Sequence, residues 1–258
     1  MDKNETMMKL IKVMTGLAII PLAFVIMVIF HDRTADKSDY NYEQFSASQY
    51  SHGFFNGPDV GSAAEDFTLL DTQGVKHSLS DYRGSYLVLE TGSLTCPQYI
   101  SRIEPMRSVL EDHPDVTFLT IYVREAHPGS LIGSHSSQQE KSTLASRLLT
   151  EEPESRTVLV DELTGSVHQS YGAWPNMVYI VSPEGNIAFR GMWNNPEVVS
   201  EVLTRLKTNR PVGELATGLT PKFDDTGRVL DRAGGHAKSD FVLGVVASAF
   251  GYASTGVN

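Results

Sequence analysis

Short apolar segments alternate with segments of helical periodicity through the middle of this 258-residue chain. Residues 116–123 form an apolar run, which is typical of a strand buried on both faces of a sheet. Residues 138–149 instead repeat apolar side chains at the spacing of an amphipathic helix. Strands that alternate with helices predict an α/β domain, because a helix is the usual connection between two parallel strands.

The predicted elements end with a hairpin and a final helix. Strands are expected at residues 67–71, 76–79, 86–91, 116–123, 157–161, 177–181 and 187–190. Helices are expected from Pro97 to about residue 110, and at residues 138–149, 164–171 and 196–206. This order predicts a thioredoxin-like α/β fold, in which the reactive residue lies between the end of a central strand and the start of the next helix.

Cys96 stands at such a junction and is the only cysteine of the chain. Pro97 suits the first helical position, so Cys96 is predicted to be the N-cap, where the helix dipole favours a thiolate over a thiol. A buried, unreactive cysteine is the alternative interpretation. Tyr99 occupies the position of the second thiol of a Cys-x-x-Cys oxidoreductase, so any partner thiol has to come from outside the chain.

Residues 13–30 form an uncharged apolar run that is long enough to cross a bilayer as a single transmembrane helix. No small-residue cleavage site follows this run, so we expect it to be retained as an anchor. Three basic residues precede it and two follow closely, an excess that favours a cytoplasmic N-terminus and an extracytoplasmic domain.

The rest of the chain divides around this anchor and one main domain. We expect a tail at residues 1–12, a linker at 31–62, the main domain at 63–208 and a partly flexible C-terminal extension at 209–258. The linker is rich in aromatic residues, and these are expected to pack on the domain.

Four motifs carry a family resemblance. They are Gly92-Ser93-Leu94-Thr95-Cys96-Pro97, the sequence IYVREAHP at 121–128, AWPNMVYIV at 173–181 and WNNPEVV at 193–199. Together they resemble the iodothyronine deiodinases, with cysteine in place of the usual selenocysteine. The resemblance covers residues 63–208 and implies a thioredoxin-like fold, a membrane anchor and thiol-dependent reductive dehalogenation.

The resemblance also implies roles for individual residues. Cys96 is the expected nucleophile. Beside the resemblance, Glu125 and His127 follow a buried strand, so both are expected to face the crevice of Cys96. There His127 can hold Cys96 as a thiolate or carry a proton, and Glu125 can fix the His127 tautomer; a capping glutamate and an exposed loop histidine are the alternative interpretation. The residues expected to contact the substrate are His135, Ser93, Thr95 and Pro175.

Two positions depart from the family pattern. Leu94 stands where some members carry a second thiol, and Met177 stands where the resemblance leads us to expect an arginine that contacts the substrate. Met177 offers no charged grip for a carboxylate, so simple iodinated phenols are expected to be handled better than phenols with an amino-acid tail.

The residues leave two other functions open. A one-cysteine peroxidase would use Ser93, three residues before Cys96, and an arginine, for which Arg190 is the candidate. A noncatalytic, membrane-anchored redox-fold module is the other function, and it requires an inert Cys96.

Composition limits the partners. The net charge of −10 and the lack of a basic patch exclude nucleic acid, and no ligand spacing indicates a metal or cofactor. The expected partners are a halogenated phenol or a peroxide, an external thiol reductant and the membrane, and a homodimer is left open.

Overall fold

A seven-stranded mixed sheet forms the centre of the computed structural model, which describes residues 40–46, 57–213, 215–217 and 223–245. The strands are β1 (Thr68–Asp71), β2 (Lys76–Ser78), β3 (Leu87–Gly92), β4 (Thr117–Tyr122), β5 (Thr157–Val160), β6 (Met177–Val181) and β7 (Ile187–Met192). Their spatial order is β2-β1-β5-β4-β3-β6-β7. Each expected strand is present, with ends that differ from the prediction by two residues at most.

The sheet contains both parallel and antiparallel pairs of strands. Strands β3, β4 and β5 are parallel to one another, whereas β6 runs antiparallel to β3 and forms the predicted hairpin with β7. A central parallel pair extended by an antiparallel hairpin is the arrangement of a thioredoxin-like fold, which confirms the predicted fold class. The carboxyl ends of β3, β4 and β5 therefore meet at one edge of the sheet.

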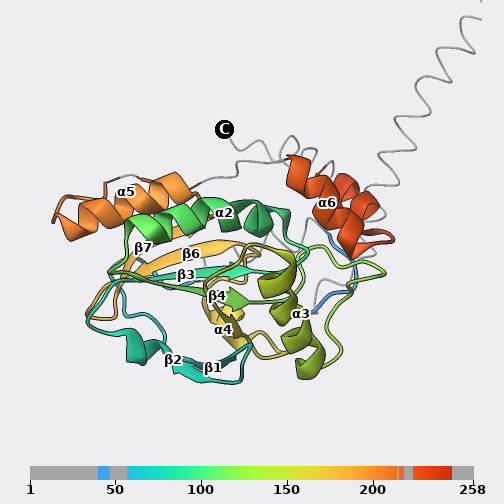
Figure 1. Cartoon of the computed structure of the whole chain (residues 1–258), viewed down its shortest axis with the longest axis horizontal. Helices are drawn as coiled ribbons and strands as arrows, with labels where there is room; N and C mark the ends of the chain where they lie inside the picture. Colours follow the sequence, from blue (N-terminus) through green and yellow to red (C-terminus); the bar gives the residue numbers. More distant parts are fainter. Residues whose placement is uncertain (1–39, 47–56, 214, 218–222, 246–258) are drawn as a thin grey trace, which may run out of the picture.

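Helices cover both faces of this sheet (Figure 1). They are α2 (Pro97–Asp112), α3 (Gln138–Glu151), α4 (Ser166–Ser170), α5 (Pro196–Lys207) and α6 (Phe223–Ala233), with a 3₁₀ helix η2 (Leu79–Tyr82) after β2. Figure 1 shows α2 and α5 side by side along one face, with α4 on the other side of the sheet. The predicted helices are all found, and η2 and α6 are additional.

The apolar side chains of the sheet form a core on each face. Leu87 and Leu89 of β3 point into the cluster that also holds Val167 of α4, whereas Val88 points into the cluster that holds Val199 of α5. Every residue of β3 and β6 is buried. Burial on both faces explains why these strands lack polar alternation in the sequence.

Helix α6 belongs to the predicted C-terminal extension and packs against α2. At its end, the Ala233 carbonyl oxygen accepts hydrogen bonds from the backbone N–H groups of Leu131, at 2.8 Å, and of Ile132, at 3.1 Å. The chain is helical again over residues 237–245. This part of the extension therefore lies on the domain.

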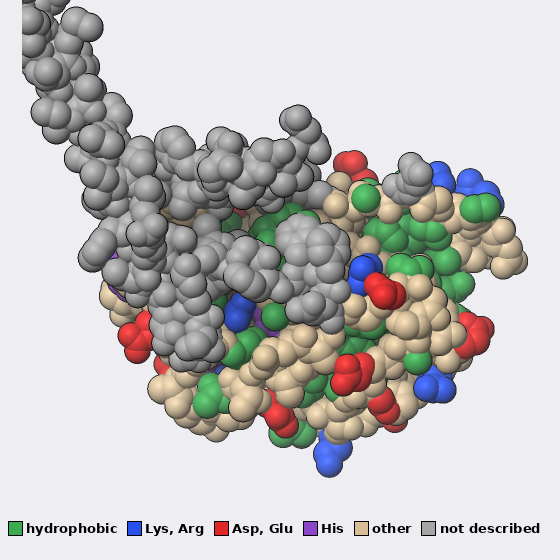
Figure 2. Space-filling model, turned by 180° about the vertical axis from the view of Figure 1, so that it is seen from behind, with side chains coloured by type: hydrophobic (Ala, Val, Ile, Leu, Met, Phe, Trp, Pro, Cys, Tyr) green, Lys and Arg blue, Asp and Glu red, His purple; other side chains and the backbone are tan. Residues whose placement is uncertain are grey.

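The predicted transmembrane run at residues 13–30 lies outside the described residues. Within the described part of the chain, no helix has both the length and the apolar character that a membrane crossing needs. On the face shown in Figure 2, Lys and Arg side chains are dispersed among acidic and neutral ones.

Candidate active site

Cys96 lies at the junction between the carboxyl end of β3 and the start of α2. It is the N-cap residue, with extended backbone (φ −96°, ψ 102°), and Pro97 is the first residue of the helix. The backbone N–H of Cys96 donates to the Ser93 carbonyl oxygen at 3.2 Å, which closes the turn between strand and helix. The predicted position of the thiol is confirmed.

Tyr99 packs against the end of β3 at the position where a dithiol oxidoreductase carries its second cysteine. A Cβ atom added to Gly92 would lie 2.3 Å from the Tyr99 ring, so only glycine allows the ring to approach the strand this closely. The Tyr99 hydroxyl donates to Oε2 of Glu154 at 2.6 Å. Tyr99 thus fixes the first turn of α2, which begins directly after Cys96, against β3 and Glu154.

The thiol of Cys96 is buried, with 1% of the residue exposed. Burial raises the pKa of this thiol to about 12, with a further increase from Glu90 and Glu125, and the backbone N–H groups of Tyr99 and Gln98 only partly oppose the change. The expectation that the helix N-terminus would stabilise a thiolate is wrong for this arrangement, because desolvation outweighs the helix dipole. Reaction at Cys96 requires the site to open or a ligand to replace what covers it.

Glu125 is the centre of a buried hydrogen-bond network beside Cys96. Its Oε2 atom accepts from the backbone N–H of Thr95 at 3.0 Å and from the Thr95 hydroxyl at 2.7 Å. Its Oε1 atom accepts from the Tyr122 hydroxyl and contacts Nε2 of His135 at 3.1 Å. Burial tends to raise the pKa of Glu125, but the hydrogen bonds and charge of these partners outweigh it and lower the pKa overall. Glu125 is therefore a carboxylate that ties the Cys96 loop to the segment after β4.

His127 does not pair with Glu125, so the prediction that Glu125 fixes its tautomer is wrong. Thr95 lies between the two residues, since its hydroxyl donates to Glu125 and also accepts from the backbone N–H of His127 at 3.1 Å. Burial lowers the pKa of His127 to about 3. Its Nδ1 atom has no hydrogen-bond partner among the described residues, and its ring lies edge-on to Phe45 and Phe241 at centroid distances of 4.4 and 5.1 Å.

The residues expected to contact the substrate lie around the same loop. Ser93 and Thr95 are fully buried, and the Ser93 hydroxyl accepts from the backbone N–H of Ala126 at 3.2 Å. Both hydroxyl groups thus cross-link the two loops. Pro175 is buried and has a trans peptide bond. His135 is the partner of Glu125, a role that local sequence does not indicate, because the two residues meet only in the folded site.

A second buried network, which the sequence analysis did not find, lies behind the Cys96 loop. The guanidinium group of Arg156 forms a fork with Glu154, with Nε and Nη2 at 2.8 and 2.6 Å from its carboxylate oxygens, and also pairs with Glu90 of β3. Glu154 in turn accepts from Tyr99, and Glu90 accepts from the Asn176 side chain at 2.8 Å. All three charged side chains are at most 2% exposed.

Replacing Arg156 with methionine should lower the free energy of unfolding by about 3 to 5 kcal/mol, because it leaves two buried carboxylates without their partner. The matched control is Arg205→Met, which removes a half-exposed pair with Glu201 and two long hydrogen bonds to the carbonyl oxygens of Pro211 and Val212 and should cost about 1 kcal/mol or less. Urea unfolding at neutral pH measures both values. Equal losses in the two variants would contradict the structural role of Arg156.

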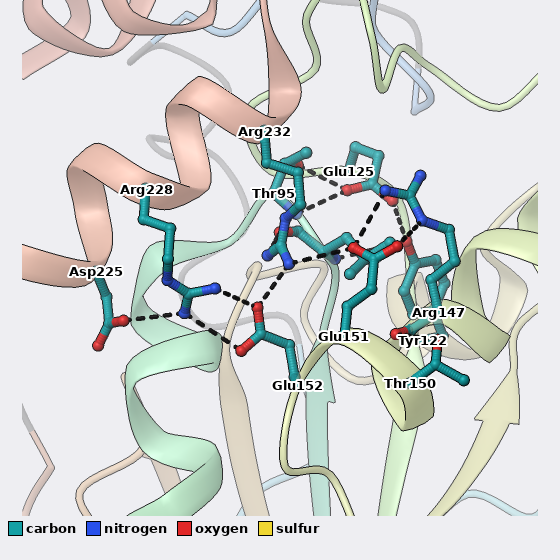
Figure 3. A network of polar contacts seen from close by, with 11 residues as sticks. Thr95, Tyr122, Glu125, Arg147, Thr150, Glu151, Glu152, Asp225, Arg228 and Arg232 are labelled. Carbon is teal, nitrogen blue, oxygen red and sulfur yellow. Dashed lines mark hydrogen bonds and ion pairs between the residues drawn. The ribbon is translucent and has the colours of Figure 1, made fainter.

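Helix α6 reaches the Cys96 loop through an arginine clamp (Figure 3). Nη2 of Arg232 donates to the carbonyl oxygen of Leu94 at 2.6 Å, while its Nη1 pairs with Glu152, also at 2.6 Å. Arg228 pairs with the same carboxylate at 2.6 Å. Val229, between the two arginines, joins the apolar cluster that contains Cys96. The extension therefore forms part of the wall around the thiol.

Arg190 does not lie at this site. Its guanidinium group donates to the carbonyl oxygens of Gly57 and Pro58 and pairs with Asp59 at 3.0 Å, beside the edge strand β7. The suggested peroxidase role of Arg190 is thus wrong, because its side chain is engaged at the sheet edge. Among the residues that the structure describes, no three His, Cys, Asp or Glu side chains are arranged to hold a metal ion.

The fold and the site define a thioredoxin-like α/β protein with a single buried thiol at a helix N-terminus, next to a buried carboxylate network. The sequence model of the iodothyronine deiodinases matches residues 42–209. The chain belongs to the iodothyronine deiodinase family, as the four motifs predicted.

Individual relatives agree with this assignment. The chain is 32% identical over 163 residues to a type I iodothyronine deiodinase of Xenopus laevis, covering 57% of this chain and 64% of the relative. It is 33% identical over 169 residues to a thyroxine 5-deiodinase of Bos taurus, covering 60% and 55% respectively. The match thus spans less than two thirds of the length of either relative.

Solved structures share the fold. A hypothetical protein of Sinorhizobium meliloti superimposes with a TM-score of 0.51 at 16% identity, covering 62% of this chain and 92% of its own. An uncharacterized conserved protein of Geobacillus kaustophilus gives a TM-score of 0.50 at 19% identity, covering 63% and 94%. At these identities the likeness concerns the fold alone.

Proposed function

We propose that this protein is a thiol-dependent reductive deiodinase that acts on iodinated phenols, with Cys96 as its nucleophile. The observation that carries the proposal is the placement of Cys96 at the start of α2, beside the Glu125 network, in a chain of the iodothyronine deiodinase family. The loop is cross-linked on both sides, so the sulfur has a fixed position relative to Glu125 and the segment that carries His127.

The proposed reaction has two steps. The sulfur of Cys96 donates an electron pair to iodine, the carbon keeps the electron pair of the carbon–iodine bond, and the carbon takes up one proton. The products are the deiodinated phenol and a Cys96 sulfenyl iodide. An external dithiol then reduces the sulfur–iodine bond, which gives back the thiol and releases a disulfide, iodide and a proton. With no second thiol in the chain, the reductant must be external.

His127 is proposed to bind the substrate, and the Glu125 network to transfer the proton. The neutral imidazole of His127 has its Nδ1 atom free to meet a phenolic hydroxyl, and its aromatic neighbours Phe45 and Phe241 suit an aromatic ligand. Glu125, Tyr122 and His135 form a chain of proton-exchanging groups that ends at Thr95, next to Cys96. This chain holds the proton that leaves the thiol and that the carbon receives.

The position of Met177 bears on the substrate. Its side chain is 5% exposed and belongs to the core cluster on the α4 side of the sheet. It supplies no charge for a carboxylate tail, and a charged hydrogen bond of that kind contributes about 1.5 to 3 kcal/mol. We therefore propose simple iodinated phenols as the preferred substrates.

The wild-type chain, purified in detergent with dithiothreitol as the reductant, should release iodide from 2,6-diiodophenol. Its kcat/KM for 3,5-diiodotyrosine, which carries an amino-acid tail, should be no higher than that for 2,6-diiodophenol, because Met177 replaces the arginine that would bind the carboxylate of the tail. Iodide release and hydrogen peroxide consumption are measured in parallel. Rapid peroxide consumption without iodide release would establish the one-cysteine peroxidase instead, and the absence of both would leave the noncatalytic module.

We also propose that residues 13–30 anchor the protein in a membrane with the domain on the extracytoplasmic side. The apolar run and the flanking basic residues support this placement. An external thiol pool on that side of the membrane would then supply the reductant.

A further inference from the structure

Residues 40–46, called the strap below, lie across the carboxyl-end loops of the sheet and contact the site at successive points. The Asn41 side chain binds the backbone of His135 through both of its amide atoms. The Tyr42 hydroxyl donates to the carbonyl oxygen of Ala126 at 2.9 Å, and Phe45 packs on His127. In Figure 1 the strap is the blue segment beside α3 and α6. A segment far away in sequence thus covers the residues around Cys96.

The guanidinium group of Arg124 lies between two tyrosine rings of the strap. Its carbon atom is 4.8 Å from the ring centroid of Tyr40 and 4.9 Å from that of Tyr42. The same group donates to the carbonyl oxygens of Tyr40, at 2.8 Å, and Ala173, at 3.2 Å. Arg124 is 8% exposed. A buried cation at this distance from a ring attracts aromatic groups specifically.

Tyr40 is held from the other side and serves as the fixed end of the strap. Its hydroxyl lies 2.7 Å from Nδ1 of His168, whose Nε2 atom donates to the Trp174 carbonyl oxygen at 2.7 Å. A Cβ atom at Gly165 would lie 1.9 Å from the Tyr40 ring, so the ring is enclosed. Tyr42 has a different environment: burial raises its pKa to about 12, Arg124 lowers it, and the charges of Cys96 and Glu125 add to the increase.

We propose that Tyr42 occupies a phenol-binding pocket bounded by Arg124 and the Ala126 backbone, next to His127 in the chain, and that a phenolic substrate enters by displacing Tyr42 and its strap neighbour Phe45. The structure already shows a phenol in this place: its ring lies on the Arg124 cation, and its hydroxyl binds the Ala126 carbonyl oxygen. Arg124 is thus a specificity-determining residue for the aromatic ring. The inference rests on the proposed function for the reaction that follows, but the binding site can be tested without turnover.

Displacement of the strap also explains how a buried thiol can react. With Cys96 1% exposed and His127 5% exposed, an iodine atom has no route to the sulfur in the closed arrangement. When Tyr42 and Phe45 leave, the substrate ring takes the position beside Arg124 and Ala126, and the ring of His127 becomes accessible. Only molecules that replace the lost aromatic contacts with Arg124 and His127 then hold the site open, which gives the strap a role in selection.

The test measures binding of 2,6-diiodophenol by calorimetry to the full chain carrying Cys96→Ser, in which no turnover occurs. When Tyr42 fills the pocket, the ligand binds only the fraction of molecules in which the pocket is open, and the apparent dissociation constant is the intrinsic one divided by that fraction. Adding Tyr42→Ala should therefore tighten binding by roughly 10-fold or more. The control is Tyr82→Ala, at a half-buried tyrosine of η2, which should leave the dissociation constant unchanged. Adding Arg124→Met to the Tyr42→Ala chain should weaken binding by roughly 5-fold.

Equal or weaker binding after Tyr42→Ala would overturn the proposal, as would the absence of binding in all variants. A second measurement covers the case in which Tyr42→Ala does not fold. Hydrogen exchange of the strap amides, followed by mass spectrometry, should speed up when the ligand is added to the Cys96→Ser chain, and unchanged or slower exchange at saturation would also overturn it. Tightened binding without deiodination by the wild type would instead uphold the pocket and reject the proposed reaction.

Discussion

Replacing Cys96 with serine should lower kcat/KM for deiodination by more than about 10³-fold, because a neutral hydroxyl is a far weaker nucleophile than a thiol or thiolate. The fold should survive, since the two side chains have nearly the same shape. Placing the more polar hydroxyl in the apolar cluster of α2 and α3 should cost about 1 to 3 kcal/mol. Kinetics and urea unfolding of the same preparation separate these two effects. Residual activity above a tenth of the wild type would remove Cys96 from the reaction.

The Glu125→Gln variant should lose roughly 10²-fold or more in kcat. A glutamine side chain has only one oxygen acceptor, whereas Glu125 receives the Thr95 backbone N–H, the Thr95 hydroxyl and the Tyr122 hydroxyl and also contacts His135. The amide NH₂ group would face at least one of these donors, so the Cys96 loop loses its anchor. The matched control is Glu151→Gln, at an exposed residue of α3 that pairs with Arg147 and lies 3.7 Å from Arg232, which should keep kcat within a factor of about two because Arg232 retains its closer partner Glu152.

The same variant gives a pH signature. The pKa of Glu125 is lower in the folded protein than the ordinary value of 4.5, so the unfolded chain binds the proton more tightly. The carboxylate therefore stabilises the wild type fully above about pH 4.5, and this stability is lost as the pH falls through the folded pKa. The difference in unfolding free energy between wild type and Glu125→Gln should shrink below that pH. A difference that stays constant would show that folding leaves the pKa of Glu125 unchanged, and a difference that grows below that pH would show that folding raises it.

Much of the fold follows from local patterns that the sequence displays directly. The buried strands β3, β4 and β6 are mostly apolar and lack regular polar alternation, as expected for strands that are covered on both faces. The N-cap position of Cys96 follows from Pro97, which cannot continue a strand ladder but suits a helix start. These signals depend on neighbours within a few residues, and they placed the thiol and the segment after β4 at the same edge of the sheet.

The details of the site depend instead on contacts between distant residues. Tyr42 and Ala126 are 84 positions apart, and Arg232 and Leu94 are 138 apart. Contacts of this kind enclose the Cys96 loop, and burial raises the pKa of Cys96 by more than the backbone N–H groups at the start of α2 lower it. The pairing of Glu125 with His135 likewise depends on where Thr95 inserts between the loops. Arg156 resembles a surface charge in the sequence, because its partners Glu90 and Glu154 meet it only in the folded sheet.

The most direct measurement of the central proposal is a single turnover without reductant. The reduced wild-type chain is mixed with an excess of 2,6-diiodophenol, the monoiodinated phenol is quantified by chromatography, and oxidised sulfur at Cys96 is trapped with dimedone after hydrolysis of the sulfenyl iodide. We expect formation of about one equivalent of product per chain at most, with an equal amount of the adduct at Cys96 and none in Cys96→Ser. Product formed without modification of Cys96, or formed equally by Cys96→Ser, would contradict the proposal.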